Sequence, residues 1–382
     1  ICLNKFKIME EKLFMAVSNR FNFVGSASFP KADSKRPFFK EFEKNKKKMA
    51  SMNFGIKESD NNMSFVEIFD SVQSEIKTKN ADGEDIVIKW ADRFDEDSIK
   101  SVANYKKFTI DLGEDFGGRQ DFISTYDAIL FLNEWLPKYK GKVMITGQFV
   151  KEFYKGEYYN KFKVNNVYAV SDDVKNKLSL SIDIYYNKDS IDKSDFKTDK
   201  KIYLNGYINQ YIDKETGSKY MPQQLIFNAS KYDIENNEKH KKLFDYKMQY
   251  LDIKNKTMQH IVWETRLVRG AEGVEWNMDL LTPKQKEQVE LGIKTVDDFK
   301  PKGQILGDKI NEIRLFDPQL TGDFTDGLVD TELSMKEFED LIYAPIVDEN
   351  IEDVINKTET KSVENKVENV IENSEVEEED LF

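Results

Sequence analysis

The chain has 382 residues, a hydrophobic fraction of 39%, an aromatic fraction of 13% and a formal net charge of −13. This length allows two or three domains with real hydrophobic cores. A single cysteine, Cys2, excludes internal disulfides and cysteine metal sites, and no apolar run approaches the ~20 residues of a membrane-spanning helix. We therefore expect an intracellular, cytoplasmic protein.

Charge is segregated along the chain. Residues 345–382 hold 13 Asp and Glu against 3 Lys, a net of −10, which leaves −3 for the preceding 344 residues. From Lys31 to Lys57, nine Lys and Arg stand against three Asp and Glu, a net of +6. This asymmetry indicates a polyanionic ligand for the body and a separate role for the tail. A solvated surface with a solubilising tail explains the charge equally well.

The N-terminal half reads as strands followed by a helix. Residues 1–14 lack an initiator Met and are expected to be a non-native or disordered extension, and Met15 could be the true start. Alternating apolar residues predict strands at 20–29, 47–57, 63–69, 85–94 and 106–113. Ala128, Leu132 and Trp135 recur with a helical period, which predicts a helix, or a strand running into a helix, between residues 121 and 141.

Two long hairpins follow, and each has a glycine inside its first strand. Residues 142–154 and 159–170 form the first hairpin, and residues 200–232 form the second. Aligning Gly206 with Gly147 also aligns the apolar residues on either side. A glycine within a long strand marks the bend that small barrels need at their corners. We interpret the two hairpins as copies of one architecture.

The C-terminal part is less regular. Residues 259–268 predict a strand, and residues 282–292 predict a short helix with Thr282 as N-cap and Gln285 completing a capping box. Residues 295–344 give a mixed pattern that predicts no defined element. The stretch after Pro345 has low complexity and is expected to be a disordered acidic tail.

The order of these elements resembles the OB-fold of bacterial and phage single-stranded-DNA-binding proteins. The residues that carry the resemblance are NRFNFVGSASF at the start, and later WLPKYKGKVMITGQFVKEFYKGEYYNKFKVNNVYAV, which resembles the family's helix, its "G-x-x-V-x-V-x-G" strand and its hairpin. The final EEEDLF is similar to the acidic tip with a terminal Pro-Phe in bacterial members, although Leu381 stands where that tip has proline. The length, the insertion around residues 70–104 and the second hairpin resemble large phage replication proteins.

The resemblance implies a fold and an organisation. The fold would be mainly β with a few helices, built from OB-fold β-barrels, two in tandem. The expected domains are an extension over 1–14, an OB-fold domain with an insertion over 15–173, a second OB-like β domain over 174–275, a small helical or mixed segment over 276–344 and the disordered acidic tail over 345–382.

The resemblance also implies a function. The protein would be a non-catalytic phage-type protein that coats single-stranded DNA during replication, recombination or repair, in the host cytoplasm if it is phage-encoded. Its oligomeric state stays open. The rival functions are a β-barrel protein–protein or structural phage protein that binds no nucleic acid, and an OB-containing accessory of a nuclease or recombination enzyme.

Binding single strands without reading sequence requires aromatic platforms and a cationic groove. On the second hairpin, Tyr203, Tyr207 and Tyr211 share with Lys201 the face opposite the apolar stripe, and Tyr220 lies across from them. The alternative is that these tyrosines pack beneath another domain or helix. Other aromatic and basic clusters complete the expected DNA-binding set, which is Lys35, Arg36, Phe38, Lys46, Lys47, Lys48, Trp90, Arg93, Tyr154, Tyr158, Tyr159, Lys161, Lys163, Lys201, Tyr203, Tyr207, Tyr211 and Tyr220.

Two further segments have expected roles. The basic stretch from Lys35 to Lys48 is expected to be a flexible loop that closes on the strand, or a solvated loop whose phenylalanines plug the barrel. The tip is expected to bind replication or recombination proteins, because its carboxylates attract a basic patch and its two apolar side chains each contribute roughly 1.5–3 kcal/mol on burial. An inert tail is the alternative. The expected partner-binding residues are Glu377, Glu378, Glu379, Asp380, Leu381 and Phe382.

Enzymatic motifs are not found in the sequence. It has neither a G-x-x-x-x-G-K-[ST] phosphate loop nor a dinucleotide glycine fingerprint. Its two histidines, His240 and His260, are far apart in sequence, so histidine-based metal sites and most nucleophile–histidine systems lack parts. We therefore expect no catalytic activity, no cofactor and no metal.

Overall fold

The computed structural model describes residues 19–31, 34–213, 215–273, 276–301, 306–320 and 327–345. Strands dominate these residues and few helices accompany them, so the prediction of a mainly β fold with a few helices is confirmed. The chain divides into two units: Ile1–Glu152 with Asn160–Tyr343, and Phe153–Tyr159 with Ala344–Phe382. The first unit contains the sheet, and the second is described separately.

The helices and strands have the following bounds. The strands are β1 (Arg20–Ser28), β2 (Phe39–Lys44), β3 (Lys47–Ser59), β4 (Asn62–Ser71), β5 (Glu75–Lys79), β6 (Asp85–Lys89), β7 (Phe108–Asp111), β8 (Arg119–Phe122), β9 (Lys142–Tyr154), β10 (Glu157–Val170), β11 (Lys177–Tyr186), β12 (Ile191–Asp192), β13 (Lys201–Asp213), β14 (Gly217–Asn228), β15 (Thr257–Gly273), β16 (Leu306–Pro318) and β17 (Val329–Ser334). The α-helices are α2 (Glu96–Ser101), α3 (Thr125–Trp135), α4 (Glu238–Met248), α5 (Pro283–Glu290) and α6 (Met335–Glu339).

The hydrogen-bonded strands close two circuits that share β11 and β15. In the first circuit β1 pairs with β3, β3 with β4, β4 with β15, β15 with β11 and β11 with β1. In the second, β11 pairs with β13, β13 with β14, β14 with β16, β16 with β15 and β15 with β11. The expected boundary between residues 173 and 174 falls in the connection from β10 to β11, and β11 pairs with β1 from the other side of that boundary.

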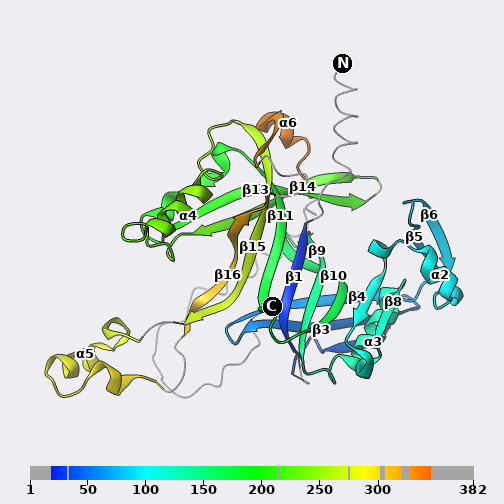
Figure 1. The fold of residues 1–382 in the computed structure, drawn as a ribbon, viewed down its shortest axis with the longest axis horizontal. Helices are drawn as coiled ribbons and strands as arrows, with labels where there is room; N and C mark the ends of the chain where they lie inside the picture. The colour runs from blue at the N-terminus through cyan, green and yellow to red at the C-terminus, as the bar shows by residue number, and fades with distance from the viewer. Residues whose placement is uncertain are drawn as a thin grey trace, which may run out of the picture. The chain divides into compact units, whose positions relative to one another are not determined.

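Beside these circuits, β9 and β10 extend the sheet from β1. Figure 1 shows β1, β9, β10 and β11 running side by side, in agreement with the strand order. The small sheet β5–β6 belongs to the expected insertion and has its own apolar cluster of Ile76, Ile88, Val102 and Ile123.

Alternating residues separate the two faces of the central strands. In β1, Phe21 and Phe23 are buried, whereas Arg20 and Asn22 lie on the opposite face. β11 follows the same rule, with Leu178, Leu180 and Ile182 in the core. Because directly paired residues point to the same face of a sheet, the core lies on one side and a continuous polar surface on the other.

The mid-strand glycines mark close approaches between backbones. A Cβ atom on Gly25 would lie 2.0 Å from the carbonyl oxygen of Lys57, and one on Gly147 would lie 1.9 Å from that of Lys163. At Gly206 the corresponding distance, to a carbonyl oxygen of β11, is 2.6 Å. These contacts explain why only glycine fits at these three positions.

The basic N-terminal segment differs from the expected flexible loop. Residues 39–44 form β2, which pairs along its whole length with β3. Asn45 and Lys46, between the two strands, have φ angles of 52° and 60°, the left-handed conformations of a two-residue hairpin turn. The Phe38 ring packs against Phe29 with centroids 4.8 Å apart. The loop prediction was wrong because a favourable turn lets the segment form a hairpin.

Several other elements add to the predicted set. The helix between residues 121 and 141 is α3, and the reciprocal hydrogen bonds of Thr282 and Gln285 confirm the capping box of α5. Neither β11 nor α4 was predicted. The stretch 295–344 contains β16, β17 and α6.

We expect Gly25→Ala to lower the free energy of unfolding by about 3 kcal/mol or more, since the new Cβ atom would collide with the Lys57 carbonyl oxygen. Denaturant unfolding followed by circular dichroism measures this. Ser26→Ala on the same strand is the control, because Ser26 is exposed and its replacement should change stability little. Equal stability of the two variants would contradict the close approach of β1 and β3.

Candidate nucleic-acid interface

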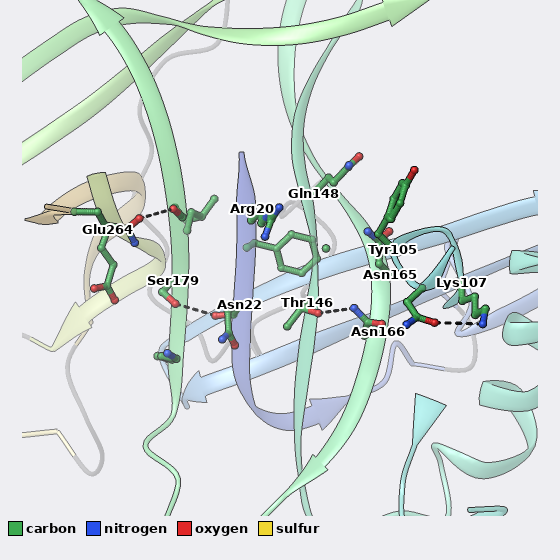
Figure 2. Close-up of a pocket in the computed structure, with 17 residues that line it drawn as sticks. Arg20, Asn22, Tyr105, Lys107, Thr146, Gln148, Asn165, Asn166, Ser179 and Glu264 are labelled. Atoms are coloured by element: carbon green, nitrogen blue, oxygen red, sulfur yellow. Dashed lines mark hydrogen bonds between the residues drawn. The ribbon is translucent and has the colours of Figure 1, made fainter. Parts of the chain in front are cut away.

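A groove with a volume of about 760 Å³ runs across the polar face of the central strands. Figure 2 shows its side chains lying across neighbouring strands. They are mostly amides, hydroxyls and cations. The lining residues are Arg20, Phe21, Asn22, Asn104, Tyr105, Lys107, Thr146, Gly147, Gln148, Asn165, Asn166, Lys177, Ser179, Leu180, Ser181, Glu264 and Gln319.

The first transverse row of the groove crosses four strands. Asn22 of β1 is directly paired with Ser179 of β11 on one side and with Thr146 of β9 on the other. The Asn166 amide of β10 donates to the Thr146 hydroxyl at 2.9 Å, and the Ser179 hydroxyl donates to the Asn22 carbonyl at 3.0 Å. Side-chain hydrogen bonds thus link β11 to β1 and β9 to β10 within the row (Figure 2).

A second row lies one pleat away. Arg20 of β1 is paired with Ser181 of β11 and with Gln148 of β9. Ser181 is in turn paired with Glu264 of β15, and its hydroxyl donates to the side chain of Gln319 at 3.1 Å. This row adds a guanidinium, amides and a carboxylate to the same face.

An irregularity in β10 turns two adjacent asparagines toward the groove. Val164 and Val167 are buried, and they are three positions apart rather than an even number. Both intervening residues, Asn165 and Asn166, line the groove. A β-bulge adds one residue to a strand and changes which side chains lie on each face of the sheet. Here it places two asparagine amides, instead of one, on the groove face.

The short 3-10 turn Asn104–Lys106 closes one end of the groove. It presents Tyr105, whose side chain is 63% exposed. The neighbouring Lys107 ammonium donates to the Asn104 side chain at 3.3 Å. An exposed aromatic ring beside a cation is the combination that stacks on a base and contacts its phosphate.

The charges that line the groove are mainly positive. Arg20, Lys107 and Lys177 stand against one carboxylate, Glu264. That carboxylate is already held at 2.6 Å by the guanidinium of Arg266. The groove therefore presents an excess of positive charge to an anion.

The centre of the groove holds an unsatisfied acceptor. The side-chain oxygen Oδ1 of Asn22 is buried, and no donor from the described residues reaches it. Buried polar atoms usually have a hydrogen-bond partner, so an orphan invites a ligand or water donor. Because the atom is buried, a base edge of a bound strand would donate to it only after the Asn22 side chain turned toward the groove.

The predicted tyrosine row is only partly open. Tyr220 is 5% exposed, and burial raises its pKa to about 12. Its ring lies 4.4 Å from that of Phe338 on α6, and Tyr207 lies 5.5 Å from the same ring. The alternative of packing beneath a helix therefore describes these two tyrosines, and Tyr220 offers no open ring for stacking.

The other members of that row are more accessible. Tyr211 is 62% exposed, whereas the Tyr203 hydroxyl donates to Asp195 at 3.0 Å. Lys201 pairs with Glu312 at 2.7 Å, and this hydrogen bond raises the pKa of the lysine. The row therefore offers one open ring and a cation that is already neutralised.

The Trp90–Arg93 cluster is structural. The Arg93 guanidinium lies between two aromatic rings, 4.5 Å from Trp90 and 4.2 Å from Phe94. Its Nε donates to the buried carboxylate of Asp127 at 2.7 Å. Held on three sides, Arg93 ties the turn after β6 to α3 and is not available to a phosphate.

The basic segment keeps most of its lysines at the surface. Lys35, Arg36, Lys46 and Lys47 are exposed. Lys48 pairs with Glu41 at 2.7 Å, a contact that raises the pKa of the lysine. None of the predicted residues of this segment lines the groove.

The first hairpin is divided between the two units. Lys161 is paired with Glu152 at 2.7 Å, whereas Lys163 is exposed on the face of β10 that also carries Asn165. In the second unit, the Tyr158 ring packs on Phe153 at 5.0 Å, and two exposed tyrosines are Tyr154 and Tyr159. The expected partner-binding residues, from Glu377 to Phe382, lie outside the described residues.

The groove residues were therefore not predicted. Each central strand does alternate, as in R-F-N-F-V and K-L-S-L-S, which indicates that one face of the strand is polar. The register that lines up Asn22, Ser179 and Thr146 joins segments more than 120 residues apart along the chain, and only the fold shows it.

No protein-family model matches the chain, and no curated protein matches it. Among the described residues, no group of three or more His, Cys, Asp or Glu is placed to hold a metal ion. No described helix is long and apolar enough to cross a membrane.

We expect Arg93→Gln to destabilise the protein by about 3 kcal/mol, because it leaves the buried Asp127 carboxylate unpaired. Its affinity for single strands should be unchanged after correction for the folded fraction. Lys100→Gln, which removes an exposed pair with Glu96, is the matched control and should cost less than about 0.5 kcal/mol. A stable Arg93 variant with weakened DNA binding would show that Arg93 contacts the ligand.

Proposed function

We propose that the protein binds single-stranded DNA along the groove, without catalysis, in a phage-type replication or recombination system. The two strand circuits support an architecture of two OB-like barrels that share β11 and β15. In such folds a curved sheet face offers the path for a single strand. The polar groove lies on a face of this kind.

The observation that carries the proposal is the pair of transverse polar rows. Their amides and hydroxyls lie beside three cations and one exposed tyrosine. Amides and hydroxyls donate to and accept from base edges, cations contact phosphates, and the ring stacks on a base. An unpaired strand exposes all three of these features, whereas a duplex buries its Watson–Crick edges.

The numbers of aromatic, basic and amide groups also indicate how the binding free energy would be divided among stacking, phosphate contacts and hydrogen bonds. Stacking contributes roughly 1–3 kcal/mol per base, and here a single aromatic ring is placed for it. Phosphate contacts from Arg20, Lys107 and Lys177 would release counterions with a salt slope on the order of −2. Hydrogen bonds to base edges supply the rest, which favours some preference among bases.

Partner recruitment is a second part of the proposal and is supported by the sequence. The acidic run before Leu381 and Phe382 combines charge attraction with apolar area. Changing Leu381 and Phe382 together to Ala should abolish capture of replication proteins in a pull-down and leave DNA affinity nearly unchanged. Capture that survives this double substitution would show that the tail does not act as a hook.

The central test is a fluorescence titration with oligo-dT at about 50 mM and about 200 mM salt. We expect binding that weakens roughly tenfold over this range, as two to three phosphate contacts predict. Tyr105→Ala should weaken binding roughly tenfold through the loss of one stacked base. Tyr211→Ala is the comparison, because the two rings are equally exposed, at 63% and 62%.

The outcomes separate the functions. Absence of binding at micromolar protein in low salt would overturn the proposal and favour a protein–protein module. Binding that depends on Tyr211 and not on Tyr105 would move the site from the groove to the second hairpin. Cleavage of labelled single strands in the presence of Mg²⁺ would favour an accessory of a nuclease.

A further inference from the structure

The groove does not end at the last strand that lines it. Ser179, in the first polar row, is paired with Arg266 of β15, and Arg266 is paired with Arg314 of β16. Paired residues share a face, so the row continues through two guanidiniums onto β16. From β10 to β16 the row crosses five strand spacings, about 24 Å at ~4.8 Å each.

Cations gather around one aromatic ring beyond the groove. The Arg266 guanidinium lies 4.3 Å from the centre of the Phe316 ring, and the ammonium groups of Lys247 and Lys231 lie 5.3 Å and 5.9 Å from it. Phe316 is the extra residue of a β-bulge in β16, between Leu315 and Asp317, and its contact with Arg266 places it beside the continued row. Strands β15 and β16, the start of the β14–α4 connection and α4 thus converge on one point.

The carboxylates of this cluster do not balance its cations. Arg266 is paired with Glu264 at 2.6 Å, Arg314 with Glu312 at 2.7 Å, and Lys247 with Asp317 at 3.0 Å. Glu312 is also the partner of Lys201. Lys231 forms no ion pair within the part of the chain that the structure describes. These ion pairs join Glu264, Glu312 and Asp317 to four cations, and Lys231 is a fifth cation beside them.

The surplus charge is felt most at Lys231. Although the residue is exposed, protein atoms crowd its ammonium group, and this desolvation lowers the pKa of Lys231. Repulsion from Lys247, Arg314 and Arg266 lowers it further, and the attraction of the Asp317 carboxylate opposes this. A bound anion would remove that repulsion, which is the energetic reason for an anion to bind here.

Glu264 stands between the groove and the cluster. Its carboxylate lines the groove and at the same time holds Arg266. In this position it places a negative charge where an approaching phosphate would lie. Exchange of this carboxylate for a phosphate would connect the groove with the cluster, because Arg266 can turn from one anion to the other.

We propose that Lys231 and Arg266, both beside the Phe316 ring, form a phosphate subsite that receives the backbone of the strand lying in the groove, with Glu264 as its built-in competitor. This inference rests on the proposed function. It predicts that the bound strand follows a line between Tyr105 at one end and Phe316 at the other. Lys247 is 3% exposed and supports the ring rather than the ligand.

The test measures oligo-dT affinity of the full chain, with an oligonucleotide of about ten bases, against salt concentration. Lys231→Gln should weaken binding about threefold at low salt and reduce the salt slope by about 0.7, the effect of one lost contact. Lys241→Gln removes the same charge from the exposed side of α4 and should change neither quantity. Glu264→Gln should tighten binding, because it removes the competing carboxylate.

The proposal is overturned if Lys231→Gln and Lys241→Gln behave alike, or if Glu264→Gln weakens binding. Failure of every variant and of the unmodified chain to bind would instead overturn the proposed function, so the two failures are distinct. If Tyr105→Ala weakens binding and Lys231→Gln does not, the groove stands and the subsite falls.

The phosphate source needs its own measurement. Inorganic phosphate at about 10 mM, with ionic strength matched by chloride, should compete with oligo-dT for the unmodified chain and have no added effect on Lys231→Gln. Calorimetry with inorganic phosphate alone gives the other arm. Tight binding of the free ion that leaves oligo-dT affinity unchanged would show that the cluster takes a small anion instead of a strand.

Discussion

The simultaneous pairing of β11 with β1 and β15 is the constraint on which the rest of the structure depends. A strand that is paired on both sides cannot shift its register by one residue without moving Leu178, Leu180 and Ile182 out of the core. The same register places Ser179 between Asn22 and Arg266. Core packing and the polar row are therefore fixed by one set of hydrogen bonds, and neither can change alone.

The polar face carries residue types that do not favour strand formation. Asparagine is depleted in strands, yet Asn22 lies in β1, and Asn165 and Asn166 lie in β10, which is separated from β1 only by β9. The side-chain oxygen Oδ1 of Asn22 also has no hydrogen-bond partner among the described residues. Residues that weaken a sheet in this way are usually found at functional sites, where they serve a ligand. The presence of these strand-disfavouring residues supports a binding function, and this argument does not depend on the net charge of the chain.

Much of the fold could be predicted from local pattern. Strong alternation located β1, β3, β4, β9 and β13, and the glycines at positions 147 and 206, which were expected to mark bends, lie where two backbones approach closely. β11 was not predicted, although Lys177–Ile182 alternates, because it lies between two hairpins that seemed to complete a repeat. β2 was interpreted as a loop because its lysines outweighed its turn signal at Asn45 and Lys46.

The site could be predicted much less well, and the reason is physical. A row of tyrosines or lysines in a sequence indicates the side of a strand but not what covers it. Phe338 is more than 110 residues from Tyr220 in sequence, yet it buries that ring. Glu312 likewise neutralises Lys201 from another strand. From composition alone, these groups are expected to contact a ligand. In the folded protein they already contact other side chains.

Availability is therefore a better guide to this interface than abundance. Arg93, Lys48, Lys161 and Lys201 are cations that the fold has paired with carboxylates. Such pairs contribute little to anion binding, because a ligand must first displace the internal partner. Lys231 differs, since three basic neighbours repel it against the attraction of one carboxylate, Asp317, and no described carboxylate forms an ion pair with it. The net charge of the chain is −13, so basic residues alone do not locate a polyanion site. A lysine that is desolvated and repelled by basic neighbours is better evidence for such a site than the long basic segment is.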